Sequence, residues 1–231
     1  MTSTCPDALR HLLAATGAVL VDFDGPVCDV FAGFPAPMVA DQLRAALIAS
    51  GSGHADWPRH IARSGDPFDL LRHAATLDET LARHVHTVLS ARETNAVASA
   101  TPTDGSSEFL RAWTATGRPV AIVSNNSALA VQAYVDLRDL RSHITHISAR
   151  TSPDPDRLKP HPYLLHRALA VLGVAPGNAV MIGDSTTDMY AAAAAGTASI
   201  GYANQRGKTT PLAMAGATHV VRGIAELTAS L

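Results

Sequence analysis

The stretch Ala18-Val-Leu-Val-Asp22-Phe-Asp24-Gly25 decides how the rest of the chain is interpreted, because a short apolar run ends there in two carboxylates and a glycine. An apolar run of this length, bounded by turn residues, is typical of a strand buried on both faces of a parallel sheet. Asp22 and Asp24 are two residues apart, so an extended backbone would point both side chains the same way. In parallel sheets, ligands bind beyond the carboxyl ends of the strands. Adjacent carboxylates repel each other unless a cation or a shared proton relieves them, which indicates a functional site.

The composition indicates a globular chain with little net charge. Its 231 residues allow one large domain, or a core domain with a smaller insert. Hydrophobic residues make up 47% of the chain, enough for a packed interior. No stretch reaches the ~18 consecutive apolar residues of a membrane helix. The 18 basic residues are balanced by 20 acidic ones without a basic run, so we expect neither nucleic acid nor a membrane as a partner.

The N-terminal residues are polar and lack the basic and apolar segments of a secretory signal. We therefore expect a cytoplasmic protein, a monomer or a homodimer, in which Cys5 and Cys28 are reduced thiols. Lysine is rare, since only Lys159 and Lys208 occur beside 16 arginines. Chemistry that requires a lysine therefore has two candidates.

The periodicity of apolar residues changes twice along the chain. Residues 31–97 carry only helical spacing, whereas strand and helix patterns alternate from about residue 104 onward. Apolar runs predict strands at 119–124, 144–147, 179–182, 199–202 and 219–221, separated by predicted helices at 105–116, 128–137, 163–172 and up to Ala195. This pattern predicts an α/β fold: a Rossmann-like doubly wound parallel sheet from residues 1–30 and 98–231, with an inserted all-helical domain at 31–97.

Polar side chains follow three of the predicted strands. Asp22 and Asp24 end the first, Ser124 and Asn125 end the next, and Gly183-Asp184 with Asp188 end a later one. Carboxylate oxygens are ligands that Mg²⁺ prefers, and a hydroxyl with N–H groups at a helix start binds anions. A lysine, which Lys159 provides, is a point charge for phosphate or for a carboxylate. These groups together point to phosphoryl transfer.

In sequence order these residues form four motifs: Asp22-x-Asp24-Gly25, Ser124, Lys159-Pro160 and Gly183-Asp184-Ser-x-x-Asp188. The set resembles the motifs of the haloacid dehalogenase superfamily over essentially the whole chain. The helical insert resembles the cap domain of the phosphoglycolate-phosphatase-like branch. One departure is Pro26, where the family commonly has a threonine, so the flap after the first motif lacks a hydroxyl and an N–H group.

The resemblance implies a role for each motif residue in a Mg²⁺-dependent phosphatase that acts on a small phosphorylated metabolite. Asp22 would be the nucleophile that forms an aspartyl-phosphate, and Asp24 would protonate the leaving alcohol and then activate water. Ser124 would bind the phosphoryl group, with Lys159 steadying that group and the nucleophile. The expected metal ligands are Asp22, Asp24 through its backbone carbonyl, Asp184 and Asp188.

Substrate contacts are expected from the core and from the insert. Gly25 belongs to the first motif and Asn125 follows Ser124, and we expect both to contact the substrate. The insert offers five candidates that could meet a second anionic group: Arg44, Arg59, His60, Arg63 and Arg72. We rank Arg59, His60 and Arg63 first, because they lie nearest the presumed loop between helices. A solvated cationic face is an equally good explanation of these three residues.

Several structural or functional alternatives stay open. Ser124 and Asp188 could be ordinary helix caps, and Lys159 a solvated loop charge. A phosphomutase would use the same intermediate, although related mutases share a Thr-x-x-His after the first motif where this chain has Cys28-Asp29-Val30-Phe31. A catalytically silent binding or regulatory module of the same fold is the third possibility.

A glycine-rich segment at Gly201–Thr209 resembles a phosphate-binding P-loop. Its glycines are separated by five residues, where that motif requires four. We therefore expect a loop at a strand end, with Lys208 solvated.

Overall fold

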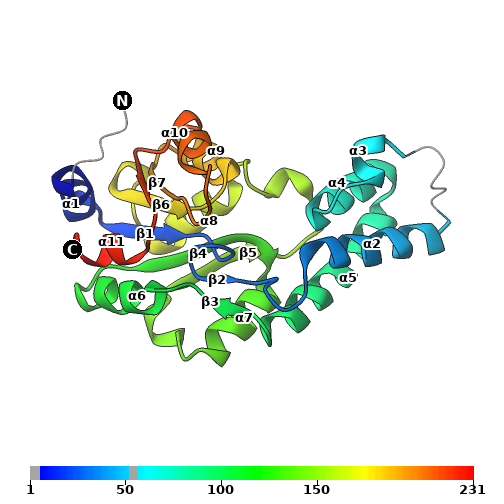
Figure 1. The fold of residues 1–231 in the computed structure, drawn as a ribbon, viewed down its shortest axis with the longest axis horizontal. Coiled ribbons are helices and arrows are strands. Elements are labelled where there is room, and N and C mark those ends of the chain that lie inside the picture. The colour runs from blue at the N-terminus through cyan, green and yellow to red at the C-terminus, as the bar shows by residue number, and fades with distance from the viewer. Residues whose placement is uncertain (1–5, 52–56) are drawn as a thin grey trace.

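The computed structural model describes residues 6–51 and 57–231 and contains a six-stranded parallel sheet with helices on both faces (Figure 1). The strand order is β5-β4-β1-β6-β7-β8, so β1 lies inside the sheet between β4 and β6. The strands are β1 (Ala18–Val21), β4 (Val120–Ser127), β5 (His146–Arg150), β6 (Ala179–Gly183), β7 (Ala198–Tyr202) and β8 (His219–Val221). The predicted Rossmann-like α/β fold is confirmed.

The organising strand β1 is buried on both faces, as its apolar run predicts. Val19 and Val21 pack into the apolar cluster that contains Phe109 and Tyr134, from helices α6 (Ser106–Ala115) and α7 (Ala128–Leu137). Its alternate residues, including Leu20, pack on the opposite face against α8 (Tyr163–Leu172) and α9 (Thr186–Ala195). Side chains of a strand alternate between its faces, so this short run joins both layers of the core.

The sequence placed one strand inaccurately and missed several short elements. β5 begins at His146 and ends at Arg150, later than the predicted 144–147, because its second half contains polar residues that a search for apolar runs passes over. The short helices α10 (Thr209–Met214) and α11 (Ala225–Thr228) were missed because they lack a full apolar repeat. A further helix, α1 (Pro6–Ala15), precedes β1. The two-residue strands β2 (Cys28–Asp29) and β3 (Thr101–Pro102) pair antiparallel where the chain leaves and re-enters the sheet region.

Every regular element in the described residues between 36 and 97 is a helix. These are α2 (Ala36–Ala49), α3 (Arg59–Ala62), α4 (Pro67–Leu77) and α5 (Glu79–Val97). Aspartates cap two of these helices: the Asp66 carboxylate accepts from the N–H of Phe68, and the Asp78 carboxylate accepts from the N–H groups of Thr80 and Leu81. Figure 1 shows these helices beyond one end of the sheet.

The helices α2–α5 enclose an apolar core of their own. Buried side chains from all of them meet there, and one buried residue, Leu158, comes from the loop that precedes Lys159. Of the helices in the described ranges, none combines the length and the apolar character needed to span a bilayer. Cys28 is a buried free thiol, while Cys5 lies outside the described residues.

Candidate active site

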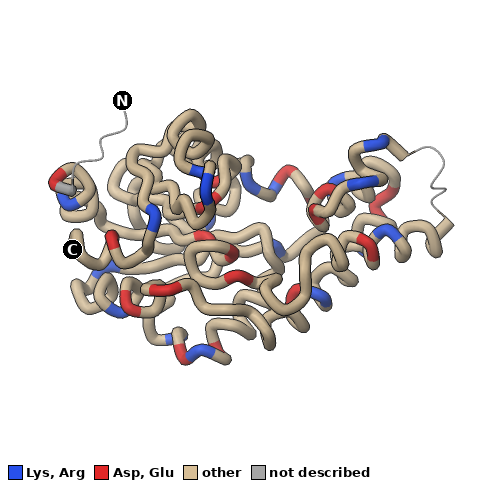
Figure 2. The backbone as a smooth tube through the Cα atoms, viewed as in Figure 1, with Lys and Arg blue, Asp and Glu red and all other residues tan. Residues whose placement is uncertain are grey.

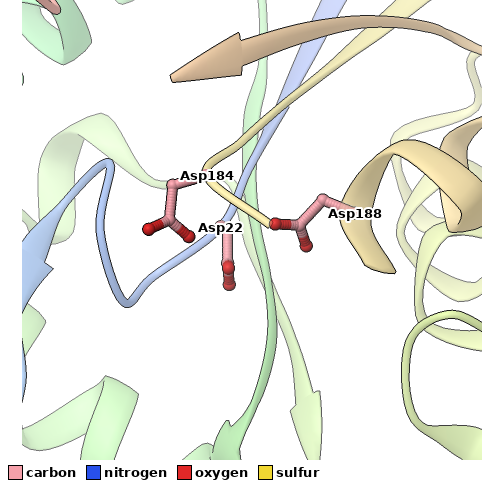
Figure 3. Close-up of side chains that lie close together, drawn as sticks. All are labelled: Asp22, Asp184 and Asp188. Carbon is pink, nitrogen blue, oxygen red and sulfur yellow. The ribbon is translucent and has the colours of Figure 1, made fainter. Parts of the chain in front are cut away.

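Three carboxylates converge at the carboxyl edge of the sheet (Figure 3). Asp22 follows β1, Asp184 follows β6, and Asp188 lies in the first turn of α9. One carboxylate oxygen from each lies within 4.8 Å of those of the other two. The arrangement follows from the sheet order, because β1 and β6 are parallel neighbours and therefore end at the same edge.

Lys159 supplies the cation that holds two of these carboxylates. Its Nζ lies 2.8 Å from Asp22 Oδ1 and 2.6 Å from Asp188 Oδ1, and donates to the carbonyl of Val123 at 3.0 Å. The residue is only 2% exposed. Burial opposes its charge, but Asp188 and Asp22 outweigh that effect and raise the pKa of Lys159 above its usual range. The ammonium group therefore stays charged, so a solvated loop charge is excluded.

Asn125 fastens the Lys159 loop to the end of β4. Its Oδ1 accepts from the backbone N–H of Lys159 at 2.8 Å, and its Nδ2 donates to the Lys159 carbonyl at 3.1 Å. Two hydrogen bonds from one amide fix both the position and the orientation of this backbone unit. Asn125, a predicted substrate-binding residue, therefore positions Lys159.

Burial makes the carboxylates of the site costly to ionise. It raises the pKa of Asp22 well above the usual range, as does the charge of Asp188, while Lys159 opposes the shift. Burial also raises the pKa of Asp24 to about 6, against the effect of the Val30 N–H that donates to Asp24 Oδ1 at 3.0 Å. Such an environment favours either a bound cation or a retained proton.

Lys208 contradicts the expectation that it is solvated. Its Nζ lies 2.6 Å from Asp184 Oδ2, and Asn204 Nδ2 donates to the same oxygen at 3.0 Å. Burial raises the pKa of Asp184, and Lys208 opposes that shift. The expectation was wrong because β7 lies beside β6, so the loop after β7 reaches the same edge of the sheet.

Asp188 serves as a helix cap and as a member of the charged cluster at once. Its Oδ2 accepts from Ser185 N at 3.1 Å and from Ser185 Oγ at 2.7 Å, and the Ser185 hydroxyl accepts from Asp188 N at 3.2 Å. This reciprocal capping box starts α9. Because Lys159 binds the other oxygen, the cap and the ion pair share one carboxylate.

The end of β4 departs from regular strand geometry. Ser124 pairs with Ala149 and Ser127 with Arg150, so the register shifts across the two asparagines between them. The Ser124 hydroxyl is fully buried, donates to Asn126 Oδ1 at 3.0 Å, and accepts from Asn126 N at 3.1 Å. The cap of α7 is Ser127, whose hydroxyl accepts from Ala130 N at 3.3 Å. Ser124 is therefore not the helix cap.

A cleft of about 340 Å³ opens over these groups. The core contributes the motif residues, and the insert contributes Asp66, Phe68 and Arg72. The full lining is Asp22, Asp24, Asp66, Phe68, Arg72, Ser124, Asn125, Asn126, Lys159, Asp184, Ser185, Thr187 and Asp188. Gly25 lines an adjacent cleft of about 490 Å³, which shares Asp24 and Asp184 with the first.

The structure does not place Arg59, His60 and Arg63 in the cleft wall. All three are exposed, on or directly after α3. Instead, the partly buried Arg72 on α4 lines the cleft, with its Nη1 3.2 Å from Asp69 Oδ1. Arg72 was one of the five candidates, but it was ranked below these three. Figure 2 shows basic and acidic residues intermixed along α2–α5, so charge alone did not rank the arginine that lines the cleft first.

Sequence reasoning missed a buried ion pair behind the cleft. Arg150 Nη2 on β5 lies 2.6 Å from Glu93 Oε2 on α5. The Arg150 side chain is 1% exposed and the Glu93 side chain 0%. One signal was available in the sequence: Glu93 lies four residues after Leu89 and three before Ala96, within an apolar helical stripe. A carboxylate on such a face needs a partner.

The family model of haloacid dehalogenase-like hydrolases matches residues 16–196, which is more than half of the chain and includes all four motifs. This protein belongs to that family. The resemblance stated from the motifs is confirmed, and the hydrolase is thus a member of a family of enzymes.

Similar proteins agree with this assignment. The phosphoglycolate phosphatase of Neisseria meningitidis is 34% identical over 102 residues, which are 44% of this hydrolase and 43% of that protein. The match spans less than half of the curated relative. CbbY from Rhodobacter sphaeroides, solved in complex with phosphate, has a TM-score of 0.69 at 21% identity, covering 92% of this chain and 96% of that one.

A predicted phosphoglycolate phosphatase from Haemophilus somnus has a TM-score of 0.65 at 19% identity, again covering 92% of this chain and 96% of the other. At these identities the solved structures show that the hydrolase shares their fold over nearly its whole length.

Proposed function

We propose that this hydrolase is a Mg²⁺-dependent phosphatase that cleaves a small phosphomonoester through an aspartyl-phosphate on Asp22. The observation that carries the proposal is the contact of one buried ammonium, Lys159 Nζ, with both Asp22 and Asp188, beside a third carboxylate on Asp184. A nucleophilic carboxylate, a cation and a cluster of hard oxygen donors are the parts that phosphoryl transfer requires.

The donor set fits a magnesium ion. Asp22 and Asp184 offer carboxylate oxygens within 4.8 Å of each other, and burial raises the pKa of both groups. A divalent cation bound between them would offset the free-energy cost of keeping both carboxylates ionised. We assign the backbone carbonyl of Asp24 as a further ligand and Asp188 as the outer member of the set. Bound Mg²⁺ would neutralise charge on the phosphoryl oxygens.

The proposed reaction has two displacements at phosphorus. An Asp22 carboxylate oxygen, oriented by Phe23 N at 2.7 Å and by Lys159, attacks phosphorus while the bond to the leaving oxygen breaks. Asp24 gives its proton to that oxygen. A water then attacks phosphorus, the bond to Asp22 breaks, and Asp24 takes the proton of the water. A pKa of about 6 suits a group that must first hold and then accept a proton near neutral pH.

The remaining residues would bind the substrate. We assign Ser124 and Asn125 to the phosphoryl group, since both line the cleft beside Lys159. We further propose that residues 31–97 form a cap over the core residues 1–30 and 98–231, and exclude water when they close. In that cap Arg72 would meet a second anionic group, which a phosphorylated carboxylic acid such as phosphoglycolate would supply, as the name of the Neisseria relative suggests.

The decisive experiment measures Mg²⁺-dependent phosphate release from p-nitrophenyl phosphate and from a panel of phosphorylated metabolites. Asp22→Asn keeps the shape of the side chain and removes the nucleophile, so we expect turnover to fall by about 10⁴-fold or more. Asp136→Asn, an exposed carboxylate paired with Arg141, is the control and should turn over normally.

The other outcomes discriminate the alternatives. Near-normal turnover of Asp22→Asn would refute the assigned nucleophile. Transfer of the phosphoryl group to a sugar, with little free phosphate, would identify a phosphomutase. A folded wild-type protein with no turnover over the whole panel would favour a silent binding module.

A further inference from the structure

The two asparagines at the end of β4 leave backbone groups without partners in the sheet ladder. The register between β4 and β5 passes from Ser124–Ala149 to Ser127–Arg150, so Asn125 and Asn126 have no paired residue on β5. Buried backbone polar groups of this kind must find other partners. The structure supplies them from side chains rather than from a strand.

Three side chains bind the backbone of this segment. The Ser124 hydroxyl accepts from Asn126 N at 3.1 Å, and the other two side chains are the members of the buried ion pair. Arg150 Nε donates to the carbonyl of Asn125 at 2.9 Å, and the N–H of Ser127 donates to Glu93 Oε2 at 2.9 Å. Asn126 Nδ2 donates to Glu93 Oε1 at 3.3 Å. One end of the irregular segment is therefore fixed by Arg150 and the other end by Glu93.

The same contacts lead to the proposed phosphoryl-binding hydroxyl. Asn126, held by Glu93, accepts from the Ser124 hydroxyl through Oδ1 and donates to it through its backbone N–H. The orientation of the Ser124 hydroxyl is thus set through Asn126 by a carboxylate on α5. Because Ser124, Asn125 and Asn126 all line the cleft, a shift of this segment would displace groups that face the substrate.

Arg150 also extends this connection to the cleft wall formed by the insert. Its Nη1 donates to Ser90 Oγ at 3.3 Å, and its guanidinium lies 6.0 Å from the ring centre of Phe68, which lines the cleft. The side chain therefore contacts α4 and α5 of the insert and the end of β4 in the core.

We propose that Arg150 and Glu93 are positioning residues that hold the Ser124–Ser127 segment in the geometry that binds the phosphoryl group. This inference rests on the proposed function. A buried ion pair contributes little net stability compared with apolar residues of similar size, but it fixes geometry when all its hydrogen bonds are made. Here the Glu93 carboxylate accepts from three groups and the Arg150 side chain donates to three. The bond that joins the pair is common to both sets, so there are five bonds, of which three go to the segment and only one, to Ser90, goes elsewhere.

The test replaces the pair by apolar residues of similar size, in the double variant Glu93→Met with Arg150→Met. We expect a folded protein whose Kd for inorganic phosphate, measured by calorimetry with Mg²⁺, and whose KM for the phosphomonoester rise by about tenfold or more. The value of kcat should change by less than about threefold, since Lys159 and not this pair holds the nucleophile Asp22. Ser90→Ala removes only the bond between Ser90 and Arg150 and is the matched control, with Kd and KM unchanged.

Amide hydrogen exchange gives a readout that does not depend on activity. The Ser127 N–H should exchange faster in the double variant than in the wild type, because its acceptor Glu93 is gone. Wild-type phosphate Kd and KM in the folded double variant would overturn the positioning role. Should the double variant not fold, Arg150→Lys keeps the charge but cannot make all three contacts, and the same rise in Kd and KM is expected. A wild-type protein without phosphatase turnover would instead refute the proposed function, leaving the exchange result to judge the role of the pair.

Discussion

At the scale of single residues, Gly25 lies where the backbone approaches the Asp184 carboxylate. Its φ is +107°, and a Cβ built on it would lie 2.5 Å from Asp184 Cγ. Its carbonyl accepts from Thr103 Oγ1 at 2.5 Å, which holds the turn in place. A side chain at this position would therefore have two effects: it would strain the backbone, and it would displace Asp184, a candidate metal ligand.

These two effects can be separated by a pair of glycine variants. Gly25→Ala and Gly117→Ala both force a residue with a side chain into a positive φ, +107° and +79°, so both should lose about 1–3 kcal/mol of unfolding free energy. A Cβ at Gly117 meets nothing within 4 Å. Only Gly25→Ala should weaken Mg²⁺ binding, by about tenfold or more, in calorimetric titration. Equal Mg²⁺ affinity in both variants would contradict the role of the close approach.

At the scale of elements, α5 carries two histidines in different surroundings. His84 is exposed, whereas His86 is partly buried near Arg150, and its Nε2 has no hydrogen-bond partner among the described residues. Burial lowers the pKa of His86 from 6.5 to about 4, and the charge of Arg150 adds to the shift. The insert helix thus has a group that resists protonation while folded.

A pH dependence of stability follows from that shift. Between pH 6.5 and about 4 the unfolded chain binds a proton at His86 that the folded chain does not, so stability should fall as the pH is lowered through this window. Urea unfolding between pH 7.5 and 4 would measure the fall. His86→Gln should flatten its share of the curve, and His84→Gln should leave it unchanged. An unaltered curve for His86→Gln would show that the ring does not titrate as its surroundings indicate.

At the scale of the whole molecule, the site is assembled from loops after several strands and from the start of α9. A ligand that binds only the assembled site stabilises the folded state by mass action. Mg²⁺ at 100 times its Kd should therefore raise the unfolding free energy by about 2.7 kcal/mol, and EDTA should reverse the gain. Asp184→Asn should lose this response while Asp41→Asn, an exposed carboxylate on α2, retains it. A melting temperature that is insensitive to Mg²⁺ in the wild type would contradict the proposed metal site.

The sequence by itself determined the main alternation of strands and helices in the core, the helical character of the insert, and the four motif positions, but not the short helices α10 and α11. It could do so because a strand buried on both faces leaves a local apolar run, and because parallel strands bring their carboxyl ends to one edge wherever they lie in the chain. Asp22, Asp184 and Lys159 were therefore predictable as neighbours. The caps of α4 and α5 were equally local, since each needs only one aspartate and the first turn that follows it.

Only the tertiary structure decided which further residues reach the site. Lys208 pairs with Asp184 because β7 lies beside β6. Arg72 lines the cleft because α4 contributes to its wall. Glu93 pairs with Arg150 because α5 packs against the sheet region. Each of these contacts joins segments that are distant in the chain. Their geometry follows from how helices and strands pack in three dimensions, which local periodicity and spacing do not encode.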